Sequence, residues 1–166
     1  MNEYLSPKRR GIIGLNRCFR KILSEAPLEG AQVAFVGSPS VCLPFAEMMA
    51  YAVRDLDLHA YFVPNAVKEQ ARSLTYVEGY GFQLGQKMFP EKFDVLVIQG
   101  GCAMPGTSVK PEDISNLIEE MPKDKGLIIG VGFMGVFDKE HWTEKVRFDY
   151  IIDCTVDPVK VEKFLR

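Results

Sequence analysis

The chain has 166 residues, of which 47% are hydrophobic and 25% charged, and its formal net charge is −2. This length fits one globular domain spanning residues 1–166, and the composition argues against intrinsic disorder. The slightly acidic balance argues against a nucleic-acid partner, because an acidic body repels phosphates. We expect a cytoplasmic protein with no membrane contact, since the sequence shows neither a secretory signal nor an apolar run long enough to span a bilayer.

Basic residues are concentrated at the amino terminus. Residues 1–25 carry a net charge of +4, whereas the remainder carries −6. Apolar positions at helical spacing predict an amphipathic helix over roughly Pro7–Ala26, docked on the domain through one face. Arg10, Arg17 and Lys21 fall on the opposite face. Two interpretations stay open: a solvated helix face, or a contact for an acidic protein partner or an anionic ligand.

Five short apolar segments, each followed by a helical pattern, make up the rest of the chain. Continuous apolar strands that alternate with helices are typical of a parallel sheet covered on both faces. We therefore predict a three-layer α/β fold, Rossmann-like or flavodoxin-like, with a five-stranded, mostly parallel sheet in the order 2-1-3-4-5. The predicted strands cover residues 31–36, 58–63, 93–98, 126–131 and 148–152.

The predicted helices cover residues 43–54, 66–76 and 111–121, with a short turn at 138–142 and a closing helix over 157–164. Pro44 fits the first turn of its helix. That helix is apolar nearly all round, so we expect it to pack inside the domain or against a second copy in a homodimer. The stretch after residue 76 is interrupted by Gly79, Gly81 and Gly85, which favours a broken helix.

Right-handed crossovers place all loops that follow parallel strands at one edge of the sheet. In this strand order, a crevice is expected between the first and third strands. The candidate ligand-binding residues are those that follow the strands at this edge. They are Ser38, Ser40, Cys42, Gly100, Gly101, Cys102, Met104, Phe133, Met134 and Asp153.

Each group of candidates has a functional and a structural interpretation. The loop Gly37–Ser40 fits an anion site at a helix start, or a simple turn in which serine caps the helix. Gly100 and Gly101 supply backbone next to a ligand, or a turn that requires positive φ. Methionine and phenylalanine at the edge suit a flat organic ligand or a protein surface, or they belong to the core.

The four cysteines are widely spaced, match no structural zinc pattern and are expected to be reduced. Cys42 and Cys102 suggest a thiol nucleophile, a redox pair or a soft-metal site, with small buried hydrophobes as the alternative. No base is positioned to activate them, and His59 and His141 fit structural or exposed roles. The sequence identifies neither a catalytic residue nor a cofactor.

Four motifs at these loops resemble those of a small archaeal family, found mainly in methanogens and described as a domain of unknown function. They are Val36–Cys42 with Pro44–Glu47, Gly100-Gly101-x-Ala103-Met104-Pro105, Gly130-Val131-x-Phe133-Met134 with Phe137 and Trp142, and Tyr150–Asp153. The resemblance covers roughly residues 30–160 and excludes the basic helix. It implies an archaeal cytosolic setting and a Rossmann-like fold, and it implies no particular activity.

The sequence supports three functional hypotheses. The leading hypothesis is a domain that binds a small ligand or cofactor at the strand-end edge. The second is an accessory or regulatory protein that docks on a larger complex, as the basic amino-terminal helix and the apolar helix from Leu43 suggest. The third is a thiol enzyme or redox sensor that uses Cys42 and Cys102.

Overall fold

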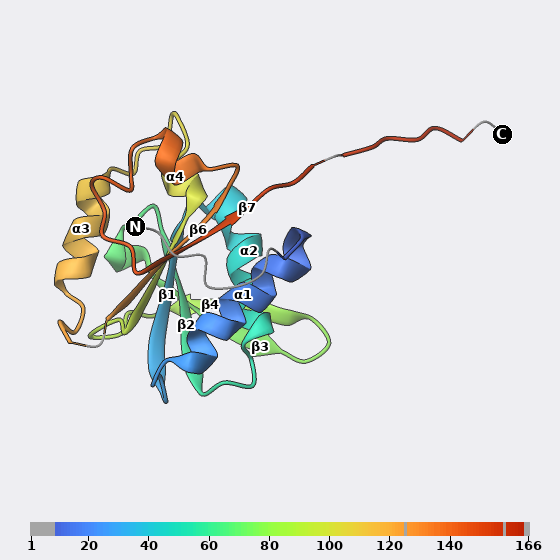
Figure 1. The fold of residues 1–166 in the computed structure, drawn as a ribbon. Helices are drawn as coiled ribbons and strands as arrows, with labels where there is room; N and C mark the ends of the chain where they lie inside the picture. Colours follow the sequence, from blue (N-terminus) through green and yellow to red (C-terminus); the bar gives the residue numbers. More distant parts are fainter. Residues whose placement is uncertain (1–8, 125, 158, 165–166) are drawn as a thin grey trace.

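A seven-stranded, mostly parallel sheet forms the centre of the protein (Figure 1). The structure is a computed structural model, and it describes residues 9–124, 126–157 and 159–164. The strands lie in the order β4-β3-β2-β1-β5-β6-β7. Their bounds are β1 Ala31–Gly37, β2 Leu58–Pro64, β3 Arg72–Val77, β4 Gly81–Lys87, β5 Val95–Gln99, β6 Leu127–Phe133 and β7 Tyr150–Cys154.

Five of these strands are parallel and have the predicted flavodoxin-like order. β1 lies at their centre and pairs with β2 from Ala31↔Leu58 onward and with β5 from Val33↔Val95 onward. β6 and β7 continue the parallel sheet beyond β5. The chain thus reverses its direction of winding between β1 and β5, which places the expected crevice at their carboxyl ends.

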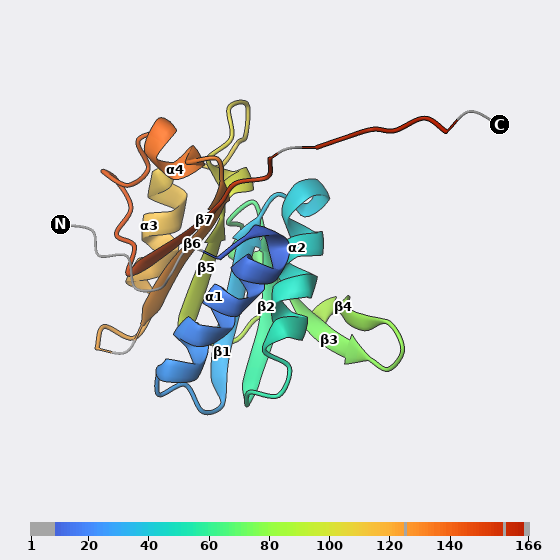
Figure 2. The same cartoon turned by 45° about the vertical axis from the view of Figure 1, so that its right-hand side comes forward.

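Helices cover the two faces of the sheet. One apolar core joins the strands to α1 (Gly11–Glu25) and α2 (Pro39–Ala52) through buried residues such as Phe19 and Met49. A second core on the other face includes Ile114 of α3 (Pro111–Glu119) and Phe137 of α4 (Val136–Lys139). Figure 2 shows α1 and α2 side by side in front of the strands, with α3 behind. No helix among the described residues is long and apolar enough to cross a membrane.

A β-hairpin replaces the helix predicted over residues 66–76. After a short 3₁₀ turn, η1 (Lys68–Gln70), the chain forms β3, which runs antiparallel to β2, and then β4 at the sheet edge. The helix prediction was wrong because β-branched and aromatic residues near Val77 favour a strand, and Gly79 and Gly81 adopt the positive φ that the connecting turn needs. The predicted five strands are therefore seven.

Two other predictions need correction. Helix α2 begins at Pro39, so Pro44 lies inside the helix and not in its first turn. The closing helix is absent from residues 155–157 and 159–164, which contain neither helix nor strand. Val161 is 95% exposed there, so its apolar side chain has no surface to pack on. Figure 1 shows this segment extending away from the body after β7. Pro7, where the first helix was predicted to begin, and Pro158 lie outside the described residues.

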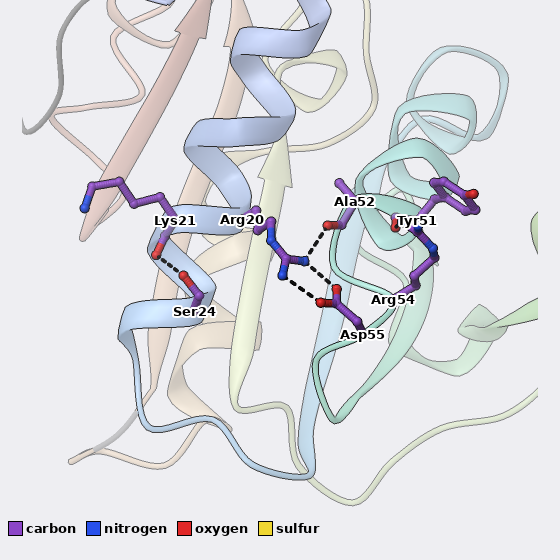
Figure 3. Close-up of polar contacts among 7 residues, drawn as sticks. All are labelled: Arg20, Lys21, Ser24, Tyr51, Ala52, Arg54 and Asp55. Atoms are coloured by element: carbon purple, nitrogen blue, oxygen red, sulfur yellow. Dashed lines mark hydrogen bonds and ion pairs between the residues drawn. The ribbon is translucent and has the colours of Figure 1, made fainter.

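Polar contacts fix α1 to the carboxyl end of α2 (Figure 3). The Arg20 guanidinium donates to the Ala52 carbonyl at 3.0 Å and to Asp55 Oδ2 at 2.7 Å, and it also pairs with Asp55 Oδ1. The pairing of Arg20 with the Asp55 carboxylate is bidentate, so it fixes the relative orientation of the two side chains in addition to pairing their charges. Lys21 pairs with Glu25 on the same helix. The other predicted contact residues, Arg10 and Arg17, are exposed.

Candidate functional site

A cleft of about 360 Å³ lies at the carboxyl ends of β5 and β6, against the first turns of α2, the helix that follows β1. The loop after β5 begins with the 3₁₀ turn η2 (Gly100–Cys102), and the loop after β6 leads into α4. These segments together line the cleft with Val41, Cys42, Phe45, Gln99, Gly100, Gly101, Met104, Pro105, Val131, Phe133, Met134, Val136, Lys139 and Glu140.

Six of the ten candidate residues lie in this lining, namely Cys42, Gly100, Gly101, Met104, Phe133 and Met134. They reach the cleft because parallel strands deliver their following loops to one edge. The other eight residues of the lining were not among the predicted ligand-binding residues. Gln99 carried the clearest signal, since a polar residue ends an otherwise apolar strand at the switch point.

The other four candidates lie outside the cleft lining. Ser38 and Ser40 contact each other, with their Oγ atoms 3.3 Å apart. Cys102 is fully buried in the second core, on the face of the sheet that α3 and α4 cover. Its thiol donates a hydrogen bond to the Val36 carbonyl at 3.6 Å. Asp153 accepts a hydrogen bond from the Gly135 amide at 2.8 Å, so it anchors the turn before α4.

Two glycines make room for Cys42 at the inner end of the cleft. A Cβ on Gly37 would lie 2.7 Å from Cys42 Sγ, and a Cβ on Gly101 would lie 2.4 Å from the same atom. Neither Gly100 nor Gly101 has a positive φ, so the turn interpretation of this pair was wrong. Gly101 is required by the close approach of sulfur, not by backbone conformation.

Burial determines the protonation of both thiols. It raises the pKa of Cys42, although hydrogen bonds from the Ser38 and Gly101 amides oppose this shift in part. Burial, with a smaller contribution from the nearby Cys42, raises the pKa of Cys102 well above its usual range. Both thiols are therefore protonated near neutral pH, which is unfavourable for nucleophilic attack.

Gln99 is the buried polar residue of the cleft lining. It is 3% exposed, and its Nε2 has no hydrogen-bond partner among the described residues. A buried donor without a partner costs about 1–3 kcal/mol, so such groups are rare in folded proteins. Nε2 lies 3.1 Å from the position of a Cβ on Gly37, which places the amide beside Cys42.

The walls of the cleft are apolar. The rings of Phe45 and Phe133 pack against each other with centroids 5.0 Å apart and planes tilted by 55°, and half-exposed Met104 and Met134 extend this surface. Lys139 and Glu140 carry opposite charges at one side of the lining. Within residues 9–124, 126–157 and 159–164, no cluster of three or more histidine, cysteine or acidic residues is arranged to hold a metal ion.

Similar proteins come from methanogenic archaea. An uncharacterized protein of Methanothermobacter thermautotrophicus is 38% identical over 136 residues, which cover 82% of this chain and 86% of the relative. An uncharacterized protein of Methanocaldococcus jannaschii is 36% identical over 92% of this chain and 91% of its own length.

The fold has a close counterpart among solved structures. A crystal structure of a protein of unknown function from Methanothermobacter thermautotrophicus matches with a TM-score of 0.84 at 34% identity, covering 98% of this chain and all of the other. Residues 10–157 match the family described as "Uncharacterized protein conserved in archaea" (DUF2124). The predicted resemblance is thus confirmed, and the chain belongs to this archaeal family.

Proposed function

We propose that the protein binds a small, mainly apolar organic molecule in the cleft at the carboxyl edge of its sheet. The observation that carries this proposal is the cleft itself, which lies between α2 and the carboxyl ends of β5 and β6 and contains aromatic walls and a single buried amide side chain. Its volume of about 360 Å³ falls within the range of roughly 300–1,000 Å³ that is typical of ligand sites.

The start of α2 gives little support for an anionic ligand. The amides of Val41 and Cys42 donate to the Ser38 carbonyl, and Pro39 has no amide hydrogen to offer. A phosphate site at a helix start needs several free amides. The apolar walls next to this segment favour an uncharged ligand instead.

Native mass spectrometry tests the proposal. The protein is purified without oxygen, incubated with a small-molecule extract of Methanothermobacter thermautotrophicus, repurified, and examined by mass and visible spectrum. We expect an added mass in the wild type. Val41→Trp should lose it, because Val41 is exposed in the first turns of α2 and a larger ring there fills the cleft.

Val77→Trp is the matched control, since Val77 is similarly exposed but lies on β3, outside the cleft lining. This variant should keep the added mass. A clean protein mass in the wild type after incubation would contradict the proposal. An added mass that survives in Val41→Trp would show that the molecule binds elsewhere.

A further inference from the structure

Gln99 is the only polar or charged residue among the buried residues that the structure describes. It is the last residue of β5 and lines the cleft at the switch point between β1 and β5. Strands ending in a sheet core normally bury apolar side chains, as the four preceding residues of β5 do. A buried amide at this position therefore needs a reason.

The surroundings of Gln99 leave its donor unused. Nε2 has no partner in the described structure, and its neighbours include Gly37, which has no side chain, and Cys42, whose thiol is only a weak acceptor. The final torsion of a glutamine side chain is broad, so the amide turns easily toward an acceptor that enters the cleft. A ligand is one source of such an acceptor.

We infer that the ligand has a flat apolar body bearing an uncharged hydrogen-bond acceptor, such as a ketone or amide carbonyl, to which Gln99 Nε2 donates. This inference rests on the proposed function. Phe45 and Phe133 receive the apolar body, while the amide fixes its orientation. Lys139 and Glu140 offset each other, so the lining holds no net charge for an ionised ligand.

Three probes, each with one benzene ring, test separately the apolar body, the hydrogen-bond acceptor and the absence of charge. Acetophenone carries a carbonyl, ethylbenzene replaces it with an apolar carbon, and benzoate carries a charged acceptor. Affinities are measured from chemical shifts of the cleft residues during titration. The wild type should bind acetophenone about five- to tenfold more tightly than ethylbenzene, and benzoate more weakly than acetophenone.

Gln99→Leu should bring the ratio of acetophenone to ethylbenzene affinity close to one, with ethylbenzene binding retained. Gln99→Met keeps the length of the side chain without a hydrogen-bond donor, so it should also remove the preference. Asn16→Leu is the matched control, because Asn16 on α1 holds the other buried unpartnered side-chain atom in the described chain and lies outside the cleft lining.

The outcomes distinguish the inference from the proposed function. Equal binding of acetophenone and ethylbenzene by the wild type, or a preference that survives in both Gln99 variants, overturns the role of Gln99 and leaves ligand binding intact. Tighter binding of benzoate overturns the uncharged class. Failure of all three probes to shift the cleft residues counts against the apolar cleft as a binding site, and the inference fails with it.

Discussion

The sulfur atom of Cys42 excludes side chains from two positions near the carboxyl ends of β1 and β5. This sulfur is enclosed by Gly37 and Gly101. The sulfur thus packs between the end of β1 and the loop after β5. The two glycines are needed because any side chain there would occupy the space of the thiol.

This arrangement predicts a coupled pair of substitutions. Gly101→Ala should destabilise the protein by about 1–3 kcal/mol, because the new methyl group would lie 2.4 Å from Cys42 Sγ. The next nearest atoms belong to Ser38 at 3.8 Å or more. In a Cys42→Ala background the same substitution should therefore have little effect. The four proteins of this double-mutant cycle are compared by urea unfolding.

Additive effects in that cycle would contradict the packing argument. They would mean that Gly101→Ala acts through the backbone of the loop rather than through contact with sulfur. If the two substitutions are coupled, and the dependence of the unfolding free energy on urea concentration is the same in all four proteins, the effect lies in the folded state.

At the scale of elements, α1 is held by both an apolar face and one ion pair. Leu15, Phe19 and Leu23 are buried against the sheet and α2. Arg20, on the same helix, reaches across to Asp55 after α2 and holds the pKa of its carboxyl down to about 2, below the ordinary value of 3.8. Since the lower value belongs to the folded state, the pair stabilises the protein only while Asp55 is ionised.

The sign of the resulting pH dependence is set by this lowered pKa. The contribution is fully present above about pH 4, and it is lost as the pH falls through about 2. Asp55→Asn should therefore flatten the decline of melting temperature between pH 4 and pH 2 relative to the wild type. Circular dichroism at several pH values measures this. Arg20→Gln should produce the same flattening, and a wild-type slope in that variant would exclude Arg20 as the cause.

At the scale of the whole molecule, the sequence predicted the parallel sheet because its strands are buried on both faces and read as continuous apolar runs. The hairpin β3–β4 was missed since it is largely exposed and has no such run. The loops of the cleft were predicted because topology sends them to one edge. Which side chains reach the cleft depends on the position at which each strand ends and the next helix begins, and the sequence does not fix that position. Val41 and Gln99 line the cleft, whereas Ser38 does not.

The carboxyl-terminal segment lies outside the body of the fold. The family match ends at residue 157, and residues 159–164 are all exposed and lie outside any helix or strand. Truncation after Asp157 should thus change the melting temperature by less than about 2 °C, since exposed residues contribute little to stability. Truncation after Ile151 is the contrasting variant and should unfold the protein, because it removes Ile152 and Cys154 from the core.

A large loss of stability on truncation after Asp157 would show that the segment packs on the body or on a second copy. Light scattering over a range of concentrations distinguishes these cases. Packing on a second copy makes the mass of the full chain rise with concentration, and the truncated chain would then stay monomeric. Val159, Val161 and Phe164 are the exposed apolar residues that such a contact would bury. If the full chain and the chain truncated after Asp157 have the same melting temperature, and the mass of neither rises with concentration, the residues up to 157 account for the stability of the fold.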